Sequence, residues 1–347
     1  RFIIELELPA ASESLLDPGP FERAILALLR ERVGIGRYPN HHRSPDDVAA
    51  LAIDLASRAR AREAELTPED VESQLGIRTD YGRVPQAFPL NPAVFQERPA
   101  FRRSLFEAAQ RGEHQLVVGP PGAGKSWELT HLAEDLRQDG VLVARHYCYL
   151  EPGDELVERR ITVDALFGNL LAELSDAAPE LRNTVDERYT ASLRSVEEFL
   201  EKAVGAGRAV VLIIDGLDHI ARVRASSRGM SDEETDIVDQ LATLVVPPGA
   251  ALIVGSQPGA HLDPLREPEG VQLIERRVPP WSRDEIGALA RDLGVEEVLA
   301  ACGERDIESV LNLLSERAEG NPLYATMLSR GLLGRLATGE VPDAREW

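Results

Sequence analysis

The sequence predicts an α/β fold in which a parallel sheet is preceded by a mostly helical segment and followed by a helical lid. From residue 115 onwards, short apolar runs alternate with helical stretches, which is typical of buried parallel strands joined by crossover helices. After Pro279 the strand-like runs stop, and the apolar spacing is helical to about Leu336. The strands expected from these runs are residues 115–118, 141–147, 209–214 and 251–255.

The same patterns divide the chain into three segments. Residues 1–95 are expected to form a helical adaptor or linker segment, with a strand-like run at 2–8 and helices that begin near Pro45 and Pro68. Residues 96–278 form the α/β domain, and residues 279–347 form the lid domain. The proline-spaced stretch 84–99 has no helical or alternating period, so it is expected to be a linker. Because the chain opens at Arg1 within a strand-like run, we expect it to be a piece of a longer protein.

Start signals predict the helices around these strands. Helices are expected over residues 99–111, 126–138, 162–174 and 195–204. A capping box pairs a Ser at the helix start with an acid three residues later, and it is expected at Ser195 with Glu198 and at Ser282 with Glu285. The acidic run 231–236 is interpreted as a further helix start.

Composition excludes several classes of protein. No apolar run reaches the roughly 18 residues that a membrane span needs. The 59 acidic and 38 basic residues give a net charge of −21, which repels a phosphate backbone and argues against duplex DNA as the main ligand. The two cysteines, Cys148 and Cys302, cannot make a disulfide framework, so a reducing cytoplasm fits the chain best. Cys148 lies in an apolar run and is expected to be buried packing.

The strongest chemical signal is a glycine-rich stretch between the first expected strand and its helix. It reads Gly119-Pro120-Pro121-Gly122-Ala123-Gly124-Lys125-Ser126, which has the spacing of a P-loop. Backbone N–H groups and the helix start can surround a polyphosphate there. Lys125, one of two lysines in the chain, is expected to reach the β- and γ-phosphates, and Ser126 is expected to ligate Mg²⁺. We therefore expect ATP or ADP with Mg²⁺, bound by the residues from Gly119 to Trp127.

Two carboxylates follow the third expected strand. Asp215 comes directly after the apolar run 209–214, and Asp218 lies three residues further on. An acid at the carboxyl end of a strand beside the P-loop strand is where a second Mg²⁺ contact belongs, so Asp215 is the expected metal ligand. Asp218 is the candidate general base, which would orient or deprotonate the attacking water.

The order of these motifs resembles the STAND class of signal-transduction ATPases, in particular its NACHT-like branch. The resemblance covers roughly residues 96–335. It rests on the P-loop and on three later motifs, which are Asp215-Gly216-Leu217-Asp218 after one strand, Ser256-Gln257-Pro258 after the next, and Gly320-Asn321-Pro322 in the helical tail. The small residue after the metal aspartate and the further acid at position 218 are the features that set the NACHT-like branch apart.

The resemblance implies a slowly hydrolysing ATP/ADP switch. The nucleotide would be clamped between the α/β core and the helical tail, with Pro322 approaching it, and opening on activation would let protomers assemble into an oligomer. The family also implies an effector before this segment and a sensor after it, in a larger signalling or antiviral defence protein. Neither a membrane nor nucleic acid is expected as the main partner of this segment.

Two positions depart from the family pattern. His219 stands where an acid is frequent, and Gln257 stands where Arg is usual. A neutral amide cannot supply positive charge to a γ-phosphate, so hydrolysis is expected to be slow or helped by another guanidinium. Its candidate sources are a neighbouring protomer and four arginines of this chain, Arg222, Arg224, Arg276 and Arg277. Ser256 remains a polar contact to the γ-phosphate or the water, and the expected catalytic residues are Asp218, Lys125, Ser256 and His219.

Two other interpretations stay open. A DNA-associated AAA+ relative, of the origin-binding or transposition-helper type, would share the P-loop, the acidic strand end and the helical lid. The net charge of −21 counts against it. In a nucleotide-free scaffold, the P-loop would persist only as an element of the fold.

Overall fold

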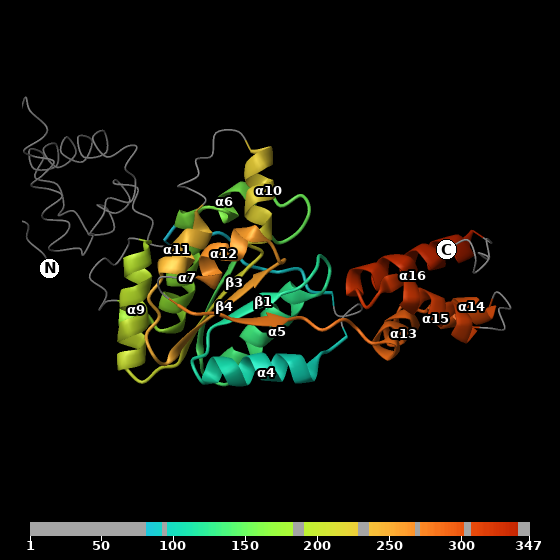
Figure 1. Ribbon diagram of the computed structural model, residues 1–347, viewed down its shortest axis with the longest axis horizontal. Helices are drawn as coiled ribbons and strands as arrows, with labels where there is room; N and C mark the ends of the chain where they lie inside the picture. Colours follow the sequence, from blue (N-terminus) through green and yellow to red (C-terminus); the bar gives the residue numbers. More distant parts are fainter. Residues whose placement is uncertain are drawn as a thin grey trace, which may run out of the picture.

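The computed structural model describes residues 81–91, 96–182, 191–227, 236–267, 271–301 and 307–338. The strand expected at 2–8, the helices expected near Pro45 and Pro68, and most of the acidic run 231–236 lie outside these residues. Figure 1 shows an α/β core with a group of helices, the lid, to one side of it. No helix in the described part of the chain is long and apolar enough to cross a membrane.

The core is built on a parallel sheet with the P-loop NTPase-like α/β fold. Its strands lie in the order β2-β3-β4-β1-β5. They are β1 (Gln115–Val118), β2 (Leu142–Tyr147), β3 (Val210–Asp215), β4 (Ala250–Ser256) and β5 (Ile274–Arg277). The first four confirm the predicted strands to within one residue at each end. Because parallel strands buried on both faces are continuously apolar, the sequence pattern was sufficient to find them.

The fifth strand was missed by the sequence analysis. β5 reads Ile-Glu-Arg-Arg and pairs with β1 at the edge of the sheet. Three of its four side chains are exposed. An edge strand of this kind carries no apolar run, so its existence depends on pairing with β1 rather than on its own hydrophobicity.

Strand register brings the polar strand ends together. Val118, the last residue before the P-loop, pairs with Ser256, and Asp215 pairs with Gly255. All of these residues lie at the carboxyl edge of the sheet, where open α/β sheets bind ligands. The motifs recognised in the sequence therefore share one edge.

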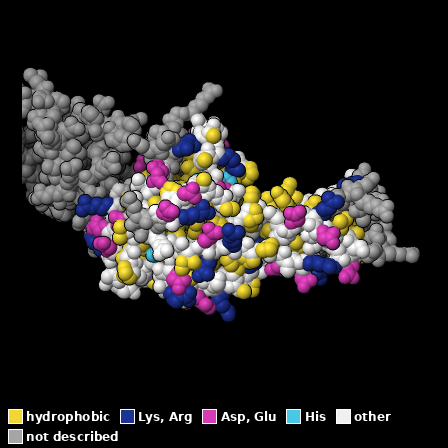
Figure 2. Space-filling view, viewed as in Figure 1, with side chains coloured by type: hydrophobic (Ala, Val, Ile, Leu, Met, Phe, Trp, Pro, Cys, Tyr) yellow, Lys and Arg dark blue, Asp and Glu magenta, His cyan; other side chains and the backbone are white. Residues whose placement is uncertain are grey.

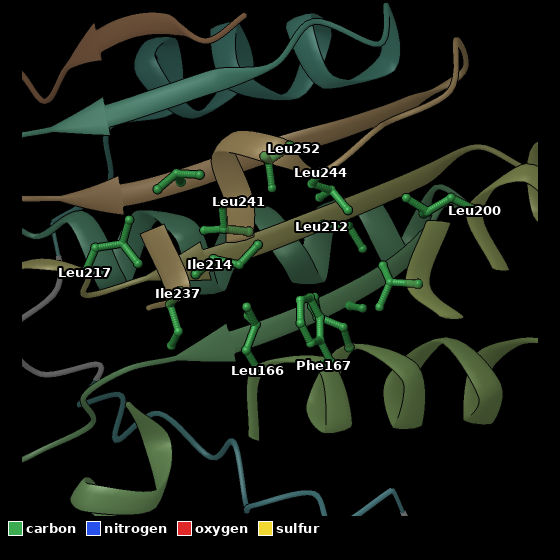
Figure 3. Close-up of a cluster of buried hydrophobic side chains, with 14 of the residues drawn as sticks. Leu166, Phe167, Leu200, Leu212, Ile214, Leu217, Ile237, Leu241, Leu244 and Leu252 are labelled. Atoms are coloured by element: carbon green, nitrogen blue, oxygen red, sulfur yellow. The ribbon is translucent and has the colours of Figure 1, made fainter. Parts of the chain in front are cut away.

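Helices cover both faces of the sheet (Figure 1). On one face lie α4 (Pro99–Gln110) and α5 (Lys125–Gln138), which pack on alternate strand residues such as Val211 and Ile213. On the other lie α7 (Val163–Ala177), α9 (Leu193–Gly205) and α11 (Ile237–Thr243). Figure 3 shows their leucines interdigitating with Leu212 and Ile214 of β3. Because successive side chains of β3 point to opposite faces of the sheet, they pack into two separate apolar clusters.

Shorter elements complete the core. They are α6 (Val157–Arg160), α8 (Pro179–Arg182), α10 (Asp218–Ser226), the 3₁₀ turn η3 (Ala260–Leu262) and α12 (Asp263–Arg266). Cys148 follows β2, is fully buried as expected, and burial raises its thiol pKa well above the ordinary value.

A strap of residues 81–91 lies against the outer edge of β2. It has no regular structure over residues 83–91, as the proline spacing predicted. Gln86 accepts a hydrogen bond from the backbone N–H of Tyr147 at 2.9 Å, and the backbone N–H of Val84 donates to Asn169 Oδ1 at 2.8 Å. The first bond pairs a backbone group of the edge strand β2, and the second joins the strap to α7.

The lid is a helical unit with its own apolar core. It consists of α13 (Arg283–Asp292), α14 (Val295–Ala301), α15 (Ile307–Ala318) and α16 (Pro322–Ala337). Trp281, Leu289, Leu314 and Leu332 are among its buried residues. Figure 2 shows hydrophobic side chains (yellow) gathered on this face where core and lid meet.

The two predicted capping boxes had different outcomes. At α13 the box of Ser282 and Glu285 is confirmed, with both reciprocal hydrogen bonds present. At α9 the N-cap is Ser192 rather than Ser195, because the helix begins one turn earlier than its apolar pattern indicated. Glu198 instead pairs with Lys202, one turn further along the helix.

A pair of glycine substitutions tests the packing of the strap. In a helix interior, Gly→Ala normally stabilises by up to about 1 kcal/mol. At Gly168 of α7, however, a Cβ would lie 2.4 Å from the carbonyl oxygen of Tyr81, so Gly168→Ala should lower the free energy of unfolding. At Gly334 of α16 a Cβ meets nothing within 4 Å, so Gly334→Ala should raise it.

Urea unfolding of the two variants and the wild-type chain measures this difference. Opposite signs for the two substitutions are expected. A stabilising Gly168→Ala would mean that the strap does not pack on α7.

Candidate functional site

The P-loop forms the turn between β1 and α5. Gly122 and Gly124 have φ angles of 73° and 90°, in the left-handed region that favours glycine. Gly124 is the residue that precedes α5, so the loop enters the helix directly. The predicted loop residues from Gly119 to Ser126 therefore have a backbone that can bring successive N–H groups toward one anion.

Lys125 lies inside this loop. It is the first residue of α5 and is 8% exposed. Its Nζ donates hydrogen bonds to the carbonyl oxygens of Gly119 at 2.9 Å and Pro120 at 3.2 Å. Burial lowers the pKa of Lys125, while the nearby charges of Asp215 and Asp218 raise it. The only ammonium near the loop among the described residues is thus bonded to loop carbonyls and lies within electrostatic range of both predicted carboxylates.

Asp215 is a buried carboxylate that lies near Ser126, Lys125 and the backbone N–H of Gly216. It ends β3 and is 1% exposed, and neither side-chain oxygen is bonded to another group in the described chain. Burial raises its pKa, and neighbouring Ser126 and Lys125 lower it. An orphaned buried carboxylate is costly, and a hard cation with oxygen ligands would satisfy it. The predicted pair of Ser126 and Asp215 therefore fits Mg²⁺.

Gly255 leaves the space that Asp215 occupies. It lies opposite Asp215 on β4, and a Cβ there would be 2.1 Å from Asp215 Oδ1 and 2.6 Å from a methyl carbon of Leu129. Sequence reasoning missed this position. The signal was present, since a lone Gly inside an apolar strand indicates close approach by another group.

Asp218 is held by Gln257. Asp218 is the first residue of α10, and its Oδ1 accepts from the backbone N–H of Gln257 at 2.9 Å. Its Oδ2 accepts from Gln257 Nε2 at 2.7 Å. The amide that stands where the resembled family usually has Arg therefore fixes the orientation of the candidate base.

His219 is stacked and oriented beside Asp218. Its ring lies 4.1 Å from the ring of Tyr149 with an interplanar angle of 2°. Nδ1 accepts from the guanidinium of Arg222, so the neutral ring carries its proton on Nε2, which is 3.4 Å from Asp218 Oδ2. Burial lowers the pKa of His219 and favours that neutral form. In this arrangement His219 is a donor toward Asp218 rather than a base.

The start of α16 docks on the P-loop. Asn321 caps the helix, and its Nδ2 donates to the carbonyl oxygen of Pro121 at 2.8 Å. The backbone N–H of Leu323 donates to the carbonyl oxygen of Gly122 at 3.3 Å. A Cβ on Gly124 would lie 4.0 Å from Pro322 Cγ. The lid proline predicted to approach the nucleotide thus lies beside the loop, and Asn321 is a contact that its sequence motif contained but did not assign.

A buried charge cluster adjoins the same loop, and the sequence analysis missed it. Arg98, just before α4, lies 3.6 Å from Glu128 of α5, and Arg102 lies 3.9 Å from it. Arg98 also lies over the ring of Trp281, 5.6 Å from its centroid, and a Cβ on Gly124 would be 3.0 Å from its Nη1. Glu128 is fully buried, and burial raises its pKa to about 7. The cluster joins α4 and α5 to Trp281, which belongs to the apolar core of the lid.

The four candidate arginines lie in different places. Arg222 contacts His219 and lies over Tyr149, and Arg224 is on the same helix. Arg276 lies 3.7 Å from Glu113 and Arg277 lies 3.2 Å from Glu275. Arg277 also pairs in register with Val118, at the mouth of the P-loop. Trp127, the remaining residue predicted to contact the nucleotide, follows Ser126 on α5 and is partly buried.

Residues 96–247 match the AAA ATPase domain family. The AAA-matching segment contains the P-loop, Asp215 and Asp218, and it ends before β4. The matched family is AAA rather than STAND, so the comparison supports the P-loop ATPase part of the resemblance, and the NACHT-like branch stays a prediction.

A curated protein is similar to part of the chain. A protein of Bifidobacterium animalis subsp. lactis, described as an AAA ATPase forming ring-shaped complexes, is 26% identical over 200 residues, which is 57% of this chain and 32% of that protein. The chain therefore spans about a third of the length of this relative.

Solved structures with similarity include the ORC2 protein of Aeropyrum pernix, with 12% identity, coverage of 76% of this chain and 67% of that chain, and a TM-score of 0.41. Domain III of the Thermotoga maritima replication initiation protein DnaA is 18% identical, and the match covers 74% of this chain and 95% of that chain with a TM-score of 0.35.

The raised pKa of Glu128 predicts a pH-dependent stability. Its value of about 7 in the folded chain exceeds the ordinary 4.5, so the folded state binds the proton more tightly. Stability should therefore fall as pH rises from about 4.5 to about 7, by up to about 3 kcal/mol at roughly 1.4 kcal/mol per pKa unit. Glu128→Gln removes this titration.

Urea unfolding at pH 5, 6, 7 and 8 compares the two chains. The difference between wild type and Glu128→Gln should change across this range, whatever constant loss the variant carries. Glu107→Gln, an exposed position on α4, is the control and should run parallel to wild type. A constant difference for Glu128→Gln would contradict the prediction.

Proposed function

We propose that this chain binds ATP with Mg²⁺, hydrolyses it, and uses the bound nucleotide to control contact between core and lid. The convergence of Lys125 and Asp215 at the P-loop carries this proposal. Lys125 is a buried cation, and Asp215 is a buried carboxylate whose pKa the charge of Lys125 lowers. A nucleotide with its metal complements both, because phosphate oxygens bind the ammonium and the metal binds the carboxylate.

The loop residues have separate tasks in binding. Backbone N–H groups of residues 122–124 and the start of α5 bind phosphate oxygens. Lys125 exchanges its bonds to loop carbonyls for bonds to the β- and γ-phosphates. Ser126 and Asp215 would hold Mg²⁺, which neutralises charge on the phosphates when it is bound.

Asp218 and its neighbours serve the chemical step. We assign Asp218 to orient the attacking water and accept its proton, because Gln257 presents the carboxylate in one orientation. Ser256 ends β4 beside it, and its hydroxyl oxygen can accept a hydrogen bond from the attacking water. His219 Nε2 lies 3.4 Å from Asp218 Oδ2 on the side of the carboxylate opposite Oδ1.

The lid contacts suggest how the nucleotide acts as a switch. Asn321 and Leu323 bind the carbonyls of Pro121 and Gly122, so the lid rests on the loop that binds phosphate. A γ-phosphate that shifts the loop would change these contacts, and only such a difference between states can bias an equilibrium. We propose that lid position in turn governs self-association, in keeping with the ring-shaped complexes described for the curated relative.

The AAA interpretation is better supported than the STAND interpretation. The family match favours an AAA-type ATPase module. A signalling or antiviral role, with effector and sensor segments in a longer cytoplasmic protein, rests on the motif resemblance alone.

The second candidate is a DNA-associated AAA+ ATPase, and the same family match favours it. The net charge of −21 opposes it. Filter binding with duplex DNA over a salt series separates the two candidates. Tight ATP-dependent binding with a steep salt dependence would establish DNA as a partner, and its absence would leave self-association.

The two lysines of the chain provide a matched test of nucleotide binding. Lys125→Ala should weaken Mg-ATP binding at least about tenfold, since hydrogen bonds to charged groups are worth about 1.5–3 kcal/mol. Lys202→Ala removes the other lysine, which pairs with Glu198 on α9, and should leave binding unchanged. Isothermal titration measures both. No binding of ATP or ADP by the wild-type chain would favour the nucleotide-free scaffold.

Asp218→Asn should separate binding from hydrolysis. Removal of the base is expected to lower kcat about a hundredfold or more, while ATP affinity stays within about threefold of wild type. Asp263→Asn, at the start of α12 where Asp263 pairs with Arg266, is the control. Phosphate release under saturating ATP gives the rate, and unchanged turnover in Asp218→Asn would remove Asp218 from the mechanism.

A further inference from the structure

At the carboxyl edge of the sheet, the Ser256 side chain lies between two other polar side chains, those of His261 and Asp218. Ser256, the last residue of β4, is fully buried. Its Oγ lies 2.8 Å from His261 Nε2 and 3.5 Å from Asp218 Oδ1. His261 belongs to the 3₁₀ turn η3, and no motif singled it out.

The Ser256 hydroxyl has one proton for these two neighbours. A hydroxyl donates once and can accept twice, so it cannot donate to His261 and Asp218 together. The bond to His261 is short, whereas 3.5 Å to Asp218 is at the limit for a hydrogen bond. Burial lowers the pKa of His261, which favours a neutral ring with one nitrogen lone pair. The distances therefore favour donation from Ser256 to His261 Nε2.

The backbone fixes the imidazole in this place. A Cβ on Gly259 would lie 2.7 Å from His261 Nδ1, so the ring packs directly on a residue without a side chain. The next residue, Leu262, is fully buried in the main core and anchors the turn. His261 is thus held from both sides of η3.

The direction of the Ser256 hydroxyl matters because several groups already surround the Asp218 carboxylate. A carboxylate accepts about four hydrogen bonds, two at each oxygen. Gln257 occupies one site on each oxygen, and His219 Nε2 faces Oδ2. A second site on Oδ1 is then the position where a proton from water can be accepted. The Ser256 hydroxyl would fill it if the hydroxyl turned toward Asp218.

We propose that His261 is a positioning residue for ATP hydrolysis, which draws the Ser256 hydroxyl away from Asp218 and keeps Oδ1 open to the attacking water. This inference rests on the proposed function and adds a residue to it. No covalent step involves His261. It accepts a hydrogen bond from Ser256, and its effect on Asp218 passes entirely through that hydroxyl.

A double-mutant cycle in the 347-residue chain tests the proposal. His261→Phe keeps the ring but removes the acceptor, so kcat should fall about five- to tenfold, as expected for one misdirected hydrogen bond. KM for ATP should stay within about twofold. In a Ser256→Ala background there is no hydroxyl to redirect, so adding His261→Phe should change kcat less than twofold.

Rescue and control variants complete the experiment. His261→Gln offers an amide oxygen to the hydroxyl and should retain most of the wild-type kcat. His131→Phe, on α5 where His131 pairs with Glu134, should leave kcat unchanged. Thermal unfolding of every variant verifies that it is folded.

Each outcome decides one question. Equal losses from His261→Phe in both backgrounds, or a failure of His261→Gln to rescue, would overturn the role of His261 while ATP hydrolysis stands. Turnover that is absent from the wild-type chain would overturn the proposed function and this role together.

Discussion

The carboxylate of Asp215 is the constraint around which the site is arranged. A charge at the buried end of β3 is unfavourable unless something positive or hydrogen-bonding meets it. The fold provides room for it by placing Gly255 opposite, and it brings Lys125 and Ser126 close through the turn between β1 and α5. A bound cation with oxygen ligands would offset this cost, which is why the proposed Mg²⁺ site includes Asp215.

Sequence patterns identified the parts of this protein that are locally encoded. The four apolar strands and the P-loop were readable because hydrophobicity and glycine spacing are properties of short segments. β5 was not readable, because its Glu and Arg side chains are exposed and β1 supplies its pairing. His261 and Asn321 acquire their roles from tertiary contacts with Ser256 and Pro121, which lie on other elements. No local pattern encodes such contacts.

The environment of Asp218 explains what a neutral side chain does at position 257. A guanidinium there would form an ion pair with the carboxylate and compete with the phosphate for it. Gln257 binds the same carboxylate through one hydrogen bond from its side-chain amide and one from its backbone N–H, and it adds no positive charge. The departure from the resembled family therefore favours orientation of Asp218 over electrostatic assistance. Under the proposed function, positive charge at the γ-phosphate would come from Lys125, from one of the candidate arginines or from a neighbouring protomer.

The bonds between lid and P-loop are made to main-chain oxygens, and this has a consequence for how tightly the loop holds an anion. The carbonyl of Pro121, which accepts from Asn321 Nδ2, belongs to the same peptide unit as the N–H of Gly122. When a donor polarises the oxygen of a peptide, the hydrogen on its other side becomes a stronger donor. When the lid is docked on the loop, the loop N–H groups are therefore stronger hydrogen-bond donors. Under the proposed function this would raise the affinity for a phosphate group without movement of any side chain in the site.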